Sequence, residues 1–294
     1  MRSTTKGYIL AITTIAIWSS TFIITKLILD FVSPTEILIL RILLAIIVLF
    51  ILYPKIDRDI QFHTEVLFLL SGVALALYFI FENSALNITY SSNVGLLVAL
   101  SPIFTTIIVS IKEKKSYFFL KNNVGLMLSL LGVGLVVFGK EGFAGVNPFG
   151  DFLAISAGLM FSFYTAFLSD VTKQYHIIQK TRKVFIYVLL SLVIYSLIAG
   201  NSIIITNRSS NIIIGILYLG IIASSFAFIF WNKAIEYIGT FKTNLFIYLV
   251  PLITMVFSAI IFDDPVTPIK VVGAIFILLG LYIVQSKKRL NKLQ

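Results

Sequence analysis

Residues 79–102, FIFENSALNITYSSNVGLLVALSP, align without a gap to residues 228–251, FIFWNKAIEYIGTFKTNLFIYLVP, and eight of the 24 positions are identical. Apolar segments match one another easily, so the pairing of Pro102 with Pro251 is more informative than the matches between aliphatic residues. Self-similarity at one fixed offset indicates repeated structural units. We therefore predict that the chain contains two copies of one unit.

The composition places both copies in a membrane. The 294 residues are 59% hydrophobic and only 12% charged, with a mean hydropathy of +1.01. Soluble domains are about one quarter charged. The charged residues here form short clusters between long apolar runs, as a bilayer requires.

The charge and the cysteine count exclude several classes of function. The net charge of +10 comes from Lys and Arg next to the apolar runs, where they face anionic lipid headgroups, so we expect no nucleic-acid partner. The chain has no cysteine, which excludes disulfides, thiolate metal sites and a cysteine nucleophile. Catalytic and nucleotide-binding motifs are also absent, so we expect no cofactor, no metal and no catalytic residues.

Runs long enough to cross a bilayer need about 20 apolar residues. We predict ten transmembrane helices, with the seventh and tenth the shortest and a link at residues 87–90 between the third and fourth. The predicted spans are Gly7–Leu27, Pro34–Tyr53, Glu65–Leu86, Ser91–Ile111, Asn122–Phe138, Gly150–Leu168, Val184–Ala199, Ile212–Trp231, Thr243–Phe262 and Ile269–Val284.

Lys and Arg are distributed unequally between the two sides of these spans. Eighteen fall on one side and four on the other. Positive residues favour the cytoplasmic side, so we predict a multi-pass protein of the cell membrane with both termini in the cytoplasm.

Ten helices in two copies give five helices per copy, at residues 1–140 and 148–290. Because five is odd, the second copy begins on the opposite side of the membrane and the repeats are inverted. We therefore predict an all-α integral membrane protein of two inverted five-helix repeats around a central cavity. Inverted repeats of this kind support alternating access in transporters.

Several motifs resemble the EamA-type family of the drug/metabolite transporter superfamily, and the resemblance covers almost the whole chain. It implies a ten-helix fold with a cavity between the halves and the export or exchange of amino acids, metabolites or drugs. The chain departs from the family after each repeat's proline, where a Gly-Glu pair is usual. The matching features are Trp18-Ser19-Ser20-Thr21-Phe22, Pro34 followed by Arg41, Ala85-Leu86 with Pro102, and Pro251 followed by Asp264.

Ionisable residues inside the spans are costly and are candidates for function. Arg41 in the second span and Glu82 in the third both lie toward the outer face. We predict that they approach one another, either as a structural ion pair or as a gate or coupling pair.

Polar and aromatic residues at mid-depth form a second group of candidates, as the lining of an apolar cavity with a few hydroxyls would. The alternative is that the small polar residues permit close helix packing. Pro102 and Pro251 are predicted helix breaks, which either flank the site or only distort the helices. The predicted substrate-binding residues are Trp18, Ser20, Tyr78, Ser101, Ser162, Tyr164, Ser224 and Tyr248.

These features favour a secondary carrier for a small organic solute, with Trp18 and Tyr164 as aromatic walls near mid-membrane. The expected partners are this small-molecule solute and the lipid bilayer, with the chain as a monomer or weak homodimer. A channel and, with less support, a membrane-embedded enzyme are the alternatives. The channel lacks rings of charge along a pore, and the enzyme lacks a catalytic dyad or metal cluster.

Overall fold

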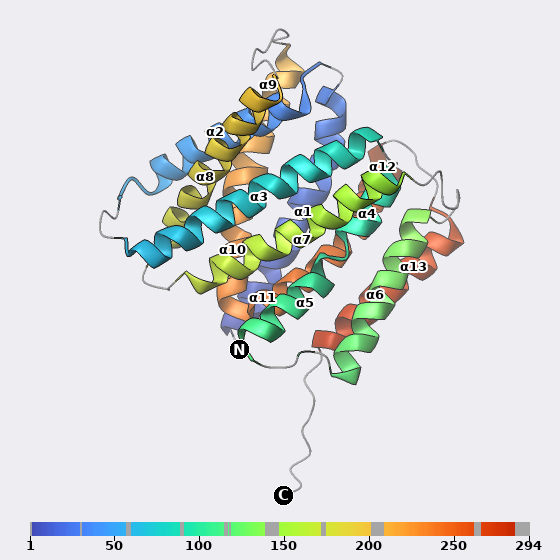
Figure 1. Cartoon of the computed structure of the whole chain (residues 1–294). Helices are drawn as coiled ribbons and strands as arrows, with labels where there is room; N and C mark the ends of the chain where they lie inside the picture. The colour runs from blue at the N-terminus through green and yellow to red at the C-terminus, as the bar shows by residue number, and fades with distance from the viewer. Residues whose placement is uncertain are drawn as a thin grey trace, which may run out of the picture.

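A computed structural model describes residues 2–29, 31–56, 60–88, 91–114, 117, 119–138, 147–171, 175–200, 209–261 and 266–285. This part of the chain is helical throughout and contains no strand (Figure 1). The helices of the first half are α1 (Arg2–Leu29), α2 (Pro34–Leu52), α3 (Phe62–Ile88), α4 (Ser91–Val98), α5 (Ser101–Lys112) and α6 (Leu120–Phe138). Those of the second half are α7 (Pro148–Asp170), α8 (Ile177–Ile198), α9 (Ser210–Leu217), η1 (Tyr218–Phe226), α10 (Ala227–Ile238), α11 (Thr240–Asn244), η2 (Leu245–Tyr248), α12 (Leu249–Ile261) and α13 (Pro268–Gln285).

Eight helical stretches in the described residues are long and apolar enough to cross a membrane. They include two composite stretches, Ser210–Ile238, which joins α9, η1 and α10, and Thr240–Ile261, which joins α11, η2 and α12. The first and fourth predicted spans are not among the eight. The first falls within the 28-residue helix α1, and the fourth is divided between α4 and α5. The count of ten therefore stays a prediction.

The start of α8 and the end of α3 differ from the predicted boundaries of the seventh and third spans. Helix α8 begins at Ile177, seven residues before the predicted start at Val184, so basic residues assigned to a loop belong to a helix. Helix α3 continues to Ile88, beyond its predicted end at Leu86. Residues 89 and 90 of the predicted link lie outside the described part of the chain.

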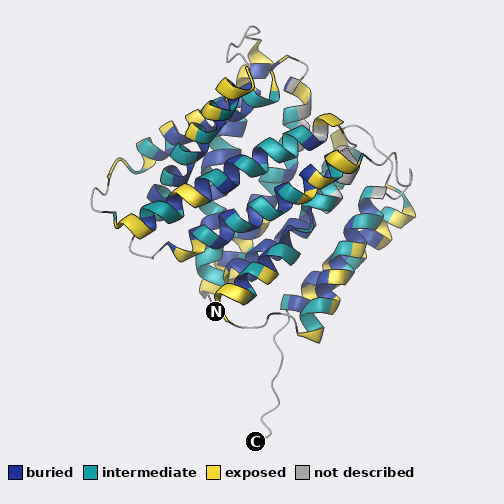
Figure 2. Ribbon diagram, viewed as in Figure 1, coloured by how far each residue is buried: buried dark blue, intermediate teal, exposed yellow. Residues whose placement is uncertain are grey.

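The bundle has an apolar exterior and a partly polar interior. Large aliphatic side chains such as Ile51 and Ile198 are exposed on the helices, which places them against lipid in a membrane. Figure 2 shows exposed positions distributed along the helices of the bundle. Buried residues include the hydroxyl-bearing Thr14, Ser71 and Thr105. Small hydroxyl side chains allow helices to approach closely and satisfy one another in an environment without water.

Helices from the two halves of the chain pack against each other in pairs. The most extensive contacts join α6 to α13, α3 to α7, and α1 to α10. Figure 1 shows α6 and α13 side by side at one edge of the bundle. Each pair takes one helix from each half, so any site in the interior is built from both halves.

Glycines bring α6 and α13 into backbone contact. A Cβ atom on Gly132 would lie 2.5 Å from the carbonyl oxygen of Gly273, and one on Gly273 would lie 2.7 Å from that of Gly132. Because no side chain fits at these distances, glycine is required for this close approach.

Both predicted helix breaks occur beside irregular backbone. Pro102 lies in the first turn of α5, directly after the turn that ends α4. Pro251 lies in the first turn of α12, directly after the 3-10 segment η2. Proline lacks an N–H group, which suits the first turn of a helix, where that group has no intrahelical partner.

Candidate functional site

The long helix Ser210–Ile238 contains a π-helical segment, η1, between its two α-helical parts. At the end of this segment the N–H group of Ala227 donates to the carbonyl oxygen of Ile222, five residues earlier. In an α-helix it would donate to Ala223 instead. The backbone is therefore locally wider, and π-helical segments of this kind often occur at functional sites.

Side chains from α1 bind to this π-helical segment. The indole N–H of Trp18 donates to the carbonyl oxygen of Ala223 at 3.2 Å. In a regular α-helix this carbonyl would accept from the N–H of Ala227, which here donates to Ile222. The Thr14 hydroxyl is shared between the carbonyl oxygen of Leu10 on its own helix, at 2.9 Å, and that of Ala227, at 3.2 Å. The hydroxyl groups of Ser20 and Tyr218 are 2.6 Å apart. Three side chains of α1 therefore hydrogen-bond to the π-helical segment or to the residue that follows it.

Arg41 from α2 also reaches this segment. Its Nε atom donates to the Ser224 hydroxyl at 2.8 Å, and both side chains are buried. The guanidinium carbon lies 5.5 Å from the ring centre of Phe79 on α3, within the range of a cation–π contact. This one side chain therefore connects α2 and α3 to the second half of the chain.

The direct ion pair expected between Arg41 and Glu82 is not formed: within the described residues, no Lys or Arg nitrogen lies within 4.0 Å of the Glu82 carboxylate. Glu82 instead accepts a hydrogen bond of 2.8 Å from the hydroxyl of Tyr78, one turn earlier on α3. The physical reason is that Ser224 holds the Nε atom of Arg41. The two charges still act on each other electrostatically.

Aromatic side chains from α7 and α10 pack on Trp18, and one from α3 extends the cluster. The ring centre of Trp18 lies 5.0 Å from those of Phe228 and Trp231 on α10 and 6.0 Å from that of Phe161 on α7. Tyr78 of α3 lies 5.3 Å from Phe161. These separations are typical of favourable aromatic packing.

These contacts close into a circuit, which we call the contact ring. Around it, Trp18 packs on Phe161, Phe161 on Tyr78, and Tyr78 on Phe79 at 5.1 Å. Phe79 then faces Arg41, which binds Ser224, and the neighbouring Ala223 returns the circuit to Trp18. Trp18 and Tyr78 are half-buried, and Phe161, Phe79 and Ser224 are buried. The members of the contact ring are Trp18, Phe161, Tyr78, Phe79, Arg41, Ser224 and Ala223.

Tyr164, predicted as the second aromatic wall, lies behind this ring and is only 1% exposed. It does not contact Trp18 directly, but its ring lies 5.7 Å from Phe161 and 6.1 Å from Phe228, which both pack on Trp18. Its hydroxyl donates to the side-chain oxygen of Asn232 at 3.0 Å.

Three further predicted residues are buried outside the contact ring. The Ser162 hydroxyl is shared between the carbonyl oxygen of Gly158 on its own helix, at 2.8 Å, and that of Ser101 on α5, at 2.9 Å. Tyr248 is fully buried in η2. The Ser101 and Tyr248 hydroxyls, together with the indole N–H of Trp231, have no hydrogen-bond partner among the described residues. Buried polar groups usually have one, so these three groups are open to a ligand or water.

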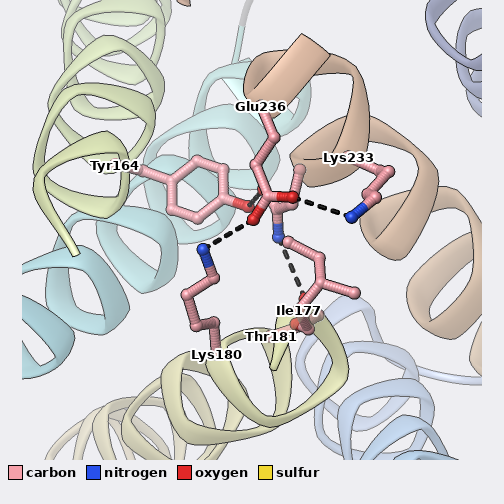
Figure 3. A network of polar contacts seen from close by, with 7 residues as sticks. Tyr164, Ile177, Lys180, Thr181, Lys233 and Glu236 are labelled. Carbon is pink, nitrogen blue, oxygen red and sulfur yellow. Dashed lines mark hydrogen bonds and ion pairs between the residues drawn. The ribbon is translucent and has the colours of Figure 1, made fainter. Parts of the chain in front are cut away.

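A polar network lies at the end of the bundle where α8 begins (Figure 3). Glu236 binds Lys180 at 2.7 Å and Lys233 at 2.9 Å, both through its carboxylate oxygens. The side chain of Asn232 accepts from Tyr164 and donates to Thr181 at 3.0 Å. The network therefore connects α7, α8 and α10.

Three basic residues near the start of α8 attach it to three other helices. Lys180 binds Glu236 of α10, Arg182 donates to the backbone oxygens of Tyr53 and Lys55 after α2, and Lys183 binds Glu65 of α3 at 2.9 Å. We call these three residues the α8 clamp. Lys180 and Arg182 are only 4% and 3% exposed, so their prediction as loop residues was wrong. Lys180 is paired with an acid, Arg182 is bound by backbone carbonyl oxygens, and both are buried, so neither faces headgroups.

A cavity of about 580 Å³ lies away from the contact ring, between α5 and α7. Its lining is almost entirely apolar, for example Phe104, Ile108 and Phe163. The Lys112–Asp170 ion pair, 2.6 Å long, lies at one end. This lining offers little to orient a polar solute. In the described residues no three His, Asp or Glu side chains lie close enough together to hold a metal ion.

The EamA-like transporter family model matches the chain at residues 5–138 and 148–286, almost its full length. The chain belongs to the EamA-like transporter family. Two proteins of Archaeoglobus fulgidus, each named an uncharacterized transporter, are 27% identical to this EamA-like chain. The matches cover 96% of the chain and 98% and 100% of the two relatives.

A third relative, the uncharacterized transporter YyaM of Bacillus subtilis, is 24% identical over 74% of the chain and 70% of its own length. A solved structure, titled only as the crystal structure of a protein, superimposes with a TM-score of 0.80 and covers 96% of both chains. Its 16% identity shows a shared fold alone. Family membership and the names of the relatives point to a transporter rather than an enzyme, in a multi-pass membrane protein.

Proposed function

We propose that this EamA-like protein is a secondary carrier that moves a small organic solute by alternating access, with the solute bound at the contact ring. The observation that carries the proposal is the origin of the ring. Trp18, Arg41 and Tyr78 come from the first half of the chain, and Phe161, Ala223 and Ser224 from the second. A solute held there touches both halves, so movement of one half against the other changes the side from which it is reached.

The chemistry of the ring favours a solute with an apolar or flat body and a polar end. Trp18, Phe161 and Tyr78 supply aromatic surface, and the neighbouring indole N–H of Trp231 has no hydrogen-bond partner in the described part of the chain. The guanidinium of Arg41 supplies charge on the other side of the ring. Amino acids, heteroaromatic metabolites and drugs have this combination, and we propose export or exchange as the direction of transport.

The proposed mechanism includes two inverted repeats, at residues 1–140 and 148–290, with both termini in the cytoplasm. The double match of the family model and the unequal distribution of Lys and Arg support this arrangement. The α8 clamp would then lie on the cytoplasmic side. Its links from α8 to α2 and α3 join the two halves, so we propose that they hold this side closed in the conformation described above.

The contact ring also bears on the alternatives. A channel needs a continuous polar path, whereas the ring consists of aromatic side chains in contact with one another and a buried arginine. An enzyme needs a catalytic group, and neither Glu82 nor Arg41 is arranged as part of a nucleophile–base pair.

The proposal is tested in two steps. Untargeted metabolite profiling of cells with and without the protein first identifies the solute that changes. Counterflow of that radiolabelled solute in proteoliposomes then compares the natural protein with Trp18→Ala and Phe152→Ala. Phe152 lies on α7, like Phe161, but is exposed on the outside of the bundle and is the matched control.

We expect solute on the far side of the membrane to accelerate exchange, and Trp18→Ala to raise the half-saturation concentration or abolish flux. The Phe152→Ala protein should exchange solute as the natural protein does. Flux without acceleration from the far side would identify a channel. Normal exchange by Trp18→Ala would show that the solute binds elsewhere.

A further inference from the structure

Glu82 is an acidic residue inside the membrane-spanning helix α3. Arg41 is the basic residue whose charge acts on it. A carboxylate in a bilayer span is costly unless it is paired or protonated. Its one hydrogen-bond donor in the described structure is the hydroxyl of Tyr78, at 2.8 Å. A single neutral donor does not replace the charge of a partner, so Glu82 needs either Arg41 or a proton.

Arg41 is within electrostatic reach of Glu82 but is held by another residue. Its Nε atom binds Ser224 at 2.8 Å, and the Phe79 ring lies 5.5 Å from its guanidinium carbon. Among the described residues, the contact with Ser224 is the one hydrogen bond that the Arg41 side chain forms. Arg41 is therefore free to change partner by moving its side chain while the backbone of α2 stays in place.

No other ionisable group competes for Glu82. Tyr78 and Arg41 are the two groups that act on it. The helices packed on α3 are α4, which has no titratable residue, α7 and α8. Those described on α7 and α8, none of which acts on Glu82, are Asp151, Tyr164, Asp170, Lys180, Arg182, Lys183, Tyr187 and Tyr195.

We propose that Glu82 is a proton-binding site and that its protonation decides whether Arg41 binds Ser224 or Glu82. This rests on the proposed carrier function and assigns it a coupling ion. A proton from water adds to a carboxylate oxygen of Glu82 and gives a neutral acid, so Arg41 stays on Ser224. When the proton leaves to water, the carboxylate charge draws Arg41 away from Ser224.

The exchange of partners changes how the two halves of the chain are connected. Arg41 and Glu82 both belong to the first half, whereas Ser224 lies in η1 of the second half. Protonation therefore makes a hydrogen bond between the halves, and proton release breaks it. This connects the proton to the same movement that exposes the solute to one side or the other.

Spin-label distance measurements test the conformational part, and the natural absence of cysteine makes labelling specific. One pair of labels is placed at Phe31→Cys and Phe149→Cys, and a second at Phe62→Cys and Lys242→Cys, all exposed positions. The labelled protein in nanodiscs is measured from acidic to alkaline buffer at constant ionic strength. Infrared spectra of the unlabelled protein over the same range report the band of a protonated carboxylic acid.

We expect both distance distributions to shift with pH and an acid band to disappear along the same curve. Glu82→Gln, which resembles the protonated acid, should keep the acidic-buffer distances at every pH and lack the band. Ser224→Ala should retain the titrating band but lose most of the pH dependence of the distances. Asp151→Asn, which removes an acid in the first turn of α7, should behave as the natural protein does.

Distances that do not change with pH, or an acid band that persists in Glu82→Gln, would overturn the inference. If Glu82→Gln does not fold, Ser224→Ala still tests the inference, because its acid band should titrate while its spin-label distances no longer follow pH. The outcome is distinct from that of solute transport. Solute counterflow with distances that do not respond to pH would contradict the proton site but support the carrier function. Distances that respond to pH without any solute exchange would contradict the carrier function.

Discussion

The indole N–H of Trp18 donates to the carbonyl oxygen of Ala223 at 3.2 Å, across the boundary between the two halves of the chain. In a regular α-helix that carbonyl would accept from the N–H of Ala227, but at the end of the π-helical segment Ala227 donates to Ile222 instead. The widened helix and the tryptophan therefore depend on each other. Several consequences of this and of the other contacts can be measured.

Replacing Trp18 by Phe should keep most of the aromatic packing but remove the indole N–H. The buried carbonyl of Ala223 then loses its donor, which costs about 1–3 kcal/mol. We expect a lower melting temperature in detergent, measured by the fluorescence of the remaining Trp231. Phe163→Leu, which changes a ring outside the contact ring, should change the melting temperature less; equal losses would show that ring packing alone stabilises the helix.

The two lysines that bind Glu236 should contribute unequally to stability. The Lys180 side chain is 5% exposed and that of Lys233 is 37% exposed, although both contacts are short. Lys180→Ala leaves the carboxylate without its buried partner, at a cost on the order of 3–5 kcal/mol. Lys233→Ala removes an exposed pair, which is worth roughly 0–1 kcal/mol. Thermal unfolding of the two variants compares them, and similar losses would contradict this ranking.

Gly132→Ala should separate α6 from α13. The new methyl group would lie 2.5 Å from the carbonyl oxygen of Gly273, so one helix must move, at a cost of about 1–3 kcal/mol. The matched control is Gly95→Ala in α4, where a Cβ meets no atom within 4 Å. Melting temperatures should fall for the first variant and hold or rise for the second. A tolerated Gly132→Ala would mean that this helix pair is loosely packed.

The orientation in the membrane is open to a direct measurement. Cysteines introduced as Ser3→Cys and Lys114→Cys should react with a membrane-impermeant reagent from the same, cytoplasmic side. Phe31→Cys, at the other end of α1, should react from the opposite side. Labelling of residues 3 and 114 from different sides would contradict the predicted helix count.

Part of the site could be predicted because its residues are rare or costly in a membrane. Trp18 is one of two tryptophans, and Arg41 and Glu82 stand out in apolar helices. Their partners could not be chosen in this way. Phe161 and Phe228 are two of 26 phenylalanines, and only the packing of α7 and α10 against α1 distinguishes them from lipid-facing ones.

The prediction was wrong where basic residues are buried in a helix instead of lying in a cytoplasmic loop. Lys180 and Arg182 have the composition of a cytoplasmic loop, yet α8 extends over them because Glu236 and the backbone oxygens after α2 receive their charges. The π-helical segment has no comparable sequence signal. Its extra width depends on donors from α1, which lie about 200 residues away in the chain.

A helix that contains a π-helical segment holds one residue more than its length requires. That surplus residue can migrate along the helix, in the way that a dislocation travels through a crystal, without all the hydrogen bonds breaking together. Each residue that the surplus passes turns by about 100° about the helix axis and moves along it by about 1.5 Å, while the helix on either side stays in place. A shift of this kind would turn Ser224 and Ser225 of η1 away from one neighbouring helix and toward another.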